Sequence, residues 1–170
     1  MKKLVIYSTL TGNTKKIAEA IYSVIEGDKE IMDVKDSMKI NINDYDKIAL
    51  GYWMDKGDAD DKMKSFMKSI RDKTVGTFGT LGAEPDSEHA AGCRAKVREL
   101  LENNGNKVER EFLCRGAISP QLIERFRKMT REGMKGHHAA TPEAEKRWAE
   151  AARHPDETDM ENAGKAFKGF

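Results

Sequence analysis

Short apolar runs alternate with amphipathic stretches along the first 130 or so residues of the chain. The apolar runs predict five strands, at 3–8, 30–34, 47–53, 73–80 and 108–114. Between them, apolar side chains recur every three or four residues and predict helices at 14–26, 59–71 and 88–103, with another beginning near Pro120. Strands that alternate with helices in this way are typical of an α/β domain whose parallel sheet is covered on both faces.

The pattern changes in the last forty residues. A turn at 133–138 is followed by a helix with Trp148 on its apolar face. The charged segment 156–170 predicts a final helix that packs weakly or against a partner. We therefore expect a domain at residues 1–132 and a C-terminal helical extension at 133–170 that is packed on or near the domain.

The loop after the first strand has the most distinctive chemistry. It contains hydroxyls, one glycine and one asparagine, and it leads directly into the first predicted helix: Ser8, Thr9, Leu10, Thr11, Gly12, Asn13 and Thr14. The first N–H groups of a helix have no partner inside the helix and lie at the positive end of its dipole, so they favour anions. The hydroxyls can donate to phosphate oxygens, and the glycine lets the backbone approach closely. The loop indicates either a phosphate site or an ordinary strand–helix loop with a good N-cap.

The same seven residues resemble the phosphate-binding loop of flavodoxins, in which (S/T)-x-T-G-x-T follows the first strand. The glycine patterns of nucleotide P-loops and of dinucleotide-binding proteins are both missing. The resemblance implies a flavodoxin-like, doubly wound, five-stranded parallel sheet of order 2-1-3-4-5 that binds FMN. Over residues 51–57, 78–87 and 112–116 the chain also resembles a compact bacterial flavodoxin subfamily, some members of which are associated with bilirubin reduction.

In a sheet of this order, ligands bind beyond the carboxyl ends of the strands, where the strand order reverses. Three loops are expected to converge there, at 8–14, 53–60 and 80–87. We expect the second loop to contribute Trp53, Met54, Asp55, Lys56 and Gly57, and the third to contribute Thr80, Leu81, Gly82 and Ala83. The Trp53 ring is suited to stacking on a flavin, and the small residues of the third loop leave backbone groups free for the ring edge.

Three positions keep alternatives open. Trp53 either stacks on the flavin or plugs the rim of the sheet. Gly57 either allows the peptide flip that flavodoxins make beside the flavin or forms a turn before a helix N-cap at Asp58. No aromatic residue lies between Thr80 and Ala91, so one flavin face is open to solvent or to a partner, or else the C-terminal extension covers it with Trp148 as a lid.

Composition narrows the class of protein. The formal net charge of +1 does not favour a nucleic-acid or membrane partner. Cys93 and Cys114 are too few for a disulfide framework, and the histidines lack the spacing of a zinc site. No segment is long and apolar enough to span a bilayer and no leader is evident, so we expect a cytoplasmic protein. We assign no metal-binding and no catalytic residue.

These observations lead to three hypotheses. The first is an FMN-binding electron-transfer protein that passes electrons between a reductase and an acceptor enzyme, because no general acid, base or nucleophile constellation is evident. The second is a flavodoxin-like oxidoreductase that acts directly on a quinone, porphyrinogen or tetrapyrrole. The third is a docking module without flavin, since a fold alone does not determine function.

Overall fold

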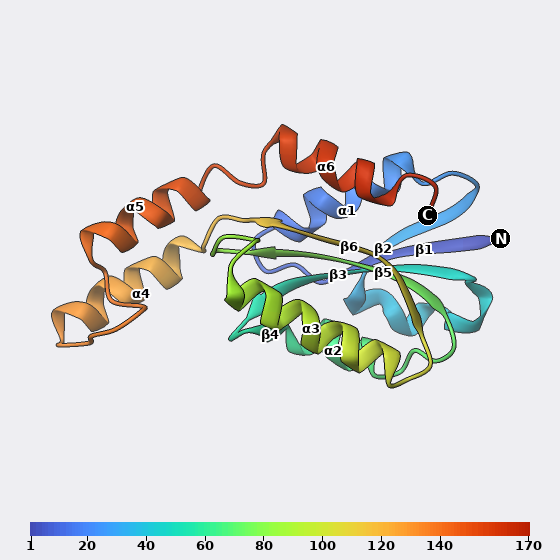
Figure 1. The fold of residues 1–170 in the computed structure, drawn as a ribbon, viewed down its shortest axis with the longest axis horizontal. Helices are drawn as coiled ribbons and strands as arrows, with labels where there is room; N and C mark the ends of the chain where they lie inside the picture. The colour runs from blue at the N-terminus through green and yellow to red at the C-terminus, as the bar shows by residue number, and fades with distance from the viewer.

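Five parallel strands form the sheet of the computed structural model, which describes residues 1–170 (Figure 1). They are β1 (Lys2–Tyr7), β2 (Asp28–Asp33), β3 (Lys47–Asp55), β5 (Thr74–Leu81) and β6 (Lys107–Arg115). Their order is β2-β1-β3-β5-β6, and each neighbouring pair is parallel. The predicted α/β class and the strand order 2-1-3-4-5 are confirmed.

A sixth, very short strand, β4 (Asp58–Ala59), was not predicted. It pairs antiparallel with the end of β3. Between the two strands, Lys56 and Gly57 have φ values of 49° and 76°. Positive φ at both central residues is typical of a type I′ turn, whose twist matches that of paired strands. The turn expected at Gly57 is present, and it closes a β-hairpin that was not predicted.

Four helices cover the two faces of the sheet, and two others stand outside it (Figure 1). The helices are α1 (Asn13–Val24), α2 (Asp61–Met67), α3 (Glu88–Glu102), α4 (Pro120–Arg131), α5 (Pro142–Ala151) and α6 (Glu157–Phe167). Two 3₁₀ helices, η1 (Val34–Lys39) and η2 (Ile42–Asp44), join β2 to β3. None of the helices combines the length and the apolar character needed to cross a membrane.

Two apolar cores lie between the sheet and its helices. Successive side chains of a strand point to opposite faces. Accordingly, Val5 and Ala49 pack under α1 and α6, whereas Leu4 and Ile48 pack under α2 and α3. The sheet is thus covered on both sides, as its continuous apolar strands require.

Helix α6 is part of the first of these cores. Phe167 is fully buried, and its ring lies edge-on to Phe78 at 6.0 Å and to Phe170 at 5.4 Å. A Cβ atom added to Gly76 of β5 would lie 2.6 Å from Cε1 of Phe167, so the bare strand position makes room for the ring. The prediction that the final helix packs weakly or against a partner is therefore wrong. Its apolar stripe faces the sheet, which periodicity alone does not reveal.

Helices α4 and α5 form a projecting hairpin, which we call the arm and define as residues 117–153. Figure 1 shows both helices extending away from the sheet. The Phe126 ring of α4 stacks on Trp148 of α5 at 5.8 Å and on His138 at 5.0 Å. Arg127 donates two hydrogen bonds of 2.7 Å to Glu145. The arm therefore has a small packed interior of its own.

Candidate functional site

The ends of four parallel strands meet at the carboxyl edge of the sheet. The N–H of Ser8, just after β1, donates to the carbonyl of Gly51 in β3 at 2.8 Å. Trp53 of β3 lies opposite Thr80 of β5, and Thr80 lies opposite Cys114 of β6. These registers bring the three predicted loops to one edge. The strand order reverses between β1 and β3, which is where ligands bind in doubly wound sheets.

The first loop ends in an open helix N-terminus. Gly12 is the N-cap of α1, with φ of 92°, and no side chain caps the helix. The first turn contains no acidic residue, and Lys15 and Lys16 are exposed there. A helix start with free N–H groups and nearby cations favours an anion. An added Cβ at Gly12 would meet no atom within 4 Å, so the approach to this turn is open.

The hydroxyls of the first loop divide into two pairs. Ser8 and Thr14 are buried: Ser8 Oγ donates to Asp60 at 2.7 Å, and Thr14 shares a 2.9 Å hydrogen bond with Thr80 of the third loop. Thr9 Oγ1 accepts from the N–H of Gly12 at 3.0 Å, which leaves its own proton free to donate. Thr11 is exposed. The first pair therefore links the loops, and the second pair faces outward with Leu10.

Asp60 organises the site, and sequence reasoning missed it. It is the N-cap of α2, and its Oδ1 accepts from Ser8 Oγ and from the N–H of Met63 at 3.2 Å. Its Oδ2 accepts from the N–H of Trp53 at 3.3 Å. Burial raises the pKa of this carboxyl group, and the hydrogen bonds it accepts act against that shift. The N-cap of this helix was expected at Asp58, and that expectation is wrong because Asp58 lies in β4. A second aspartate closer to the helix was the available signal for the actual cap.

The second loop is the β3–β4 hairpin, which carries Trp53, Met54, Asp55 and Lys56 with Gly57. Trp53 is partly exposed at the end of β3. Gly57 is buried: a Cβ there would lie 3.1 Å from His89 of α3, and its carbonyl accepts from Lys96 at 3.2 Å. A flip of this peptide would break the bond to Lys96. The geometry agrees with the turn interpretation of Gly57.

The third loop is shorter than its predicted span. Thr80 and Leu81 are buried within β5, and only Gly82 and Ala83 begin the loop. A Cβ on Gly82 would lie 2.6 Å from Ile118, so the segment after β6 packs closely over this loop. That fourth segment was not predicted to belong to the site.

Arg115, at the end of β6, is a second residue that sequence reasoning did not single out. Its guanidinium forms an ion pair of 2.9 Å with Glu84 of the third loop, and its Nε is buried without a hydrogen-bond partner. The ion pair joins β6 to the third loop, and the charge of Arg115 lies at the same edge as the predicted site.

Trp148 does not lie over the three loops. Its side chain is buried against Phe126 inside the arm, which extends away from the sheet (Figure 1). The lid suggested for Trp148 is therefore wrong. Both cysteines are buried, and burial raises the pKa of the Cys93 thiol to about 11 and that of Cys114 further still, so neither is a thiolate at neutral pH.

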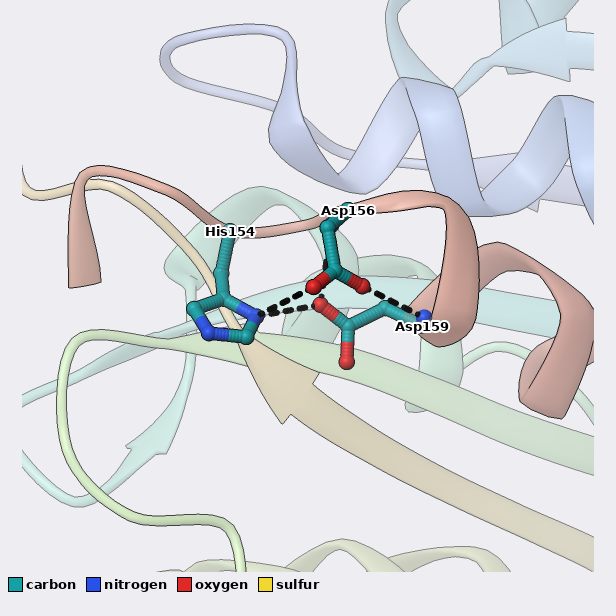
Figure 2. A group of neighbouring side chains, drawn as sticks. All are labelled: His154, Asp156 and Asp159. Atoms are coloured by element: carbon teal, nitrogen blue, oxygen red, sulfur yellow. Dashed lines mark hydrogen bonds and ion pairs between the residues drawn. The ribbon is translucent and has the colours of Figure 1, made fainter. Parts of the chain in front are cut away.

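A histidine and two aspartates meet where α6 begins. Figure 2 shows Nδ1 of His154 directed at Asp159 and towards Asp156. The distance from Nδ1 to a carboxylate oxygen is 2.6 Å for Asp159 and 3.9 Å for Asp156. Asp156 and Asp159 form a capping box, each accepting from the other's backbone N–H at 2.9 Å. The cluster is accounted for as the cap of α6, which fixes the second end of the arm.

The chain belongs to the flavodoxin family: the family model for the flavodoxin domain matches residues 4–168. The chain is 34% identical over 172 aligned positions to the flavodoxin-like domain-containing protein BilS of Clostridioides difficile, covering 100% of this chain and 96% of that protein. A flavodoxin from the domain Archaea has the same fold, with a TM-score of 0.61 and 18% identity over 98% of this chain and 94% of the archaeal one. A Lactobacillus acidophilus flavoprotein, solved in complex with FMN, has a TM-score of 0.51 and 22% identity, covering 67% of this chain and 92% of its own.

Proposed function

We propose that this protein binds FMN at the carboxyl edge of its sheet and carries electrons between a reductase and an acceptor enzyme. The observation that carries the proposal is the uncapped N-terminus of α1, which begins at Gly12 beside the switch in strand order. Membership of the flavodoxin family and the FMN in the Lactobacillus acidophilus relative support it.

The residues at this edge fit a phosphorylated flavin. The free N–H groups of α1 and the hydroxyls of Thr9 and Thr11 would hold the phosphate, and Lys15 and Lys16 add positive charge. Trp53 would lie against the ring, next to the small residues Gly82 and Ala83. Asp60 would hold the first two loops in register. When bound, FMN supplies the capacity to accept and release electrons, and the protein supplies position and electrostatics.

A carrier is favoured over an enzyme because two titratable groups buried at this edge, Asp60 and Cys114, are unsuited to act as a general acid or base. Asp60, which joins the first two loops, is buried and accepts three hydrogen bonds. The thiol at the end of β6, Cys114, is buried and has a raised pKa. Neither group is free to exchange a proton with a substrate.

The proposal is tested by separating transfer from turnover. The FMN-loaded protein is reduced under anaerobic conditions and mixed with oxidised cytochrome c, a one-electron protein acceptor. We expect cytochrome c to be reduced. Without a reductase, we expect no turnover when NADH or NADPH is supplied with menadione or bilirubin, or when protoporphyrinogen is supplied with menadione as the electron acceptor. Rapid turnover of any of these small molecules by the isolated protein would favour the oxidoreductase hypothesis over the carrier hypothesis. If the protein did not bind FMN, the flavin-free docking module would be the remaining hypothesis.

A further inference from the structure

The base of the arm is bonded directly to the proposed cofactor loops. The N–H of Ala117, where the arm begins, donates to the carbonyl of His154, where it ends, at 2.9 Å. The carbonyl of Ala117 accepts from Nδ2 of Asn13 in the first loop at 3.0 Å. Ile118 packs over Gly82 of the third loop. We call the rest of the chain, residues 1–116 and 154–170, the body. The arm therefore leaves the body at the edge where we place the FMN.

Both ends of the arm are tied to the rest of the chain, and its interior is hydrogen-bonded. Its second end is fixed by the capping network of α6, in which His154 contacts Asp159 (Figure 2). Inside the arm, Thr130 Oγ1 donates to the carbonyl of Phe126 and accepts from the N–H of Ala140, both at 2.7 Å. A surface that is ordered in advance loses less conformational entropy when a partner binds.

The arm and the body carry opposite net charges. Residues 117–153 contain eight Lys and Arg against five Asp and Glu, a formal charge of +3. The rest of the chain contains 22 against 24, a formal charge of −2. The near-neutral net charge of the whole chain is therefore the sum of a positive arm and a slightly negative body. Such a separation of charge orients an approaching charged partner.

Much of the positive charge of the arm is unpaired. Four exposed cations have no carboxylate within 4 Å: Arg125, Lys135, Lys146 and Arg147. Among the carboxylates of the arm, only Glu143 lacks a cation at that distance. Leu122, 37% exposed, adds an apolar contact on α4. Exposed cations beside an apolar residue suit the acidic surface of a protein, because interfaces combine apolar contact with complementary charge.

We propose that the arm is the docking surface for an acidic patch on a redox partner protein. This inference rests on the proposed function, because docking at the arm places the partner beside the edge that would hold FMN. The five carboxylates among the cations of the arm make a protein surface of mixed charge a better match than the uniformly negative backbone of a nucleic acid.

The test uses a reduced, acidic [2Fe–2S] ferredoxin as the probe and the FMN-loaded protein as the acceptor. Two ferredoxins each give up one electron, and these electrons, with two protons from solvent, reduce the bound FMN. Stopped-flow absorbance gives the bimolecular rate constant as a function of ionic strength. The arm variant is Lys135→Glu/Lys146→Glu/Arg147→Glu. The matched control is Lys68→Glu/Lys107→Glu/Lys168→Glu, which changes the net charge equally at exposed positions outside the arm.

We expect the wild-type rate constant to fall as ionic strength rises, since salt screens attraction between opposite charges. At low ionic strength the arm variant is expected to lose about tenfold or more, within the range of electrostatic steering, and the control about twofold or less. FMN affinity, measured by titration, is expected to be the same in all three proteins.

Equal losses in the two variants, or no loss in the arm variant, would overturn the docking surface while leaving FMN binding intact. Absence of FMN binding in the wild type would instead overturn the proposed function, and the docking inference with it. Two further results count against an acidic protein partner: self-association at low ionic strength that the arm variant abolishes, and arm-dependent retention of double-stranded DNA at physiological salt.

Discussion

Helices α5 and α6 come from the same C-terminal stretch but have different roles. Each begins with an N-cap side chain, Thr141 or Asp156, and each buries one apolar face. The apolar face of α6 packs on the sheet, where Gly76 leaves room for Phe167. That of α5 packs mainly on α4, through Trp148. The surface available to an amphipathic helix thus decides whether it closes the core or builds a separate unit.

The strongest test of this difference removes the main aromatic side chain of each helix. Phe167→Ala should lower the free energy of unfolding of the body by about 3–5 kcal/mol, because it leaves a cavity against the sheet. Trp148→Ala should shift the same transition by less than about 1 kcal/mol, because its packing lies within the arm. Trp53 and Trp148 are the only tryptophans. Trp53 emission therefore follows the body during urea unfolding in Trp148→Ala itself and, for the other proteins, in a Trp148→Phe background. Equal shifts would mean that arm and body unfold as one unit.

A second pair of substitutions compares the hydrogen bonds of the body with those of the arm. Asp60→Ala leaves three donors of the body without their acceptor and should cost about 2 kcal/mol or more. Thr130→Ala breaks two hydrogen bonds inside the arm and should leave the Trp53 transition unchanged. Hydrogen exchange of α4 and α5 should nevertheless become faster in the Thr130 variant. Slower or unchanged exchange there would contradict a locally stabilised arm.

The smallest expected change in stability comes from removing either of two matched helix N-caps. Ser87 caps α3 in the body and Ser119 caps α4 in the arm, each by a 3.2 Å hydrogen bond from a backbone N–H to its Oγ. Ser87→Ala should destabilise the body by about 1 kcal/mol. Ser119→Ala should not move the Trp53 transition. A shift of similar size in both variants would show that α4 contributes to the stability of the body.

The sheet was predictable because its evidence is local. Runs such as 47–53 are apolar throughout, as a strand buried on both faces must be, and the helices between them fix the parallel connections. The pairing of β3 with β4 was not predicted although a turn was expected at Gly57, because a Lys-Gly pair is a weaker hairpin signal than Asn-Gly.

The parts of the site that were not predicted depend on contacts distant in sequence. The loop 8–14 could be predicted from its hydroxyls and glycine, but its bonds to Asp60 and Thr80 could not. The arm base at Ala117 touches Asn13, more than a hundred residues away. The periodicity of the sequence shows which face of a helix or strand is apolar. It does not show which residues, distant in sequence, that face or a given polar side chain will contact.

We propose that the open N-terminus of α1 holds the phosphate of FMN. The most direct measurement is a comparison of FMN and riboflavin, which differ only in that phosphate, by titration of flavin fluorescence against the wild type and Thr11→Ala. We expect the wild type to bind FMN at least about tenfold more tightly than riboflavin, a difference of about 1.4 kcal/mol. We expect Thr11→Ala to weaken the binding of FMN and to leave the binding of riboflavin unchanged. Equal affinities for the two flavins in the wild type would contradict this placement of the phosphate.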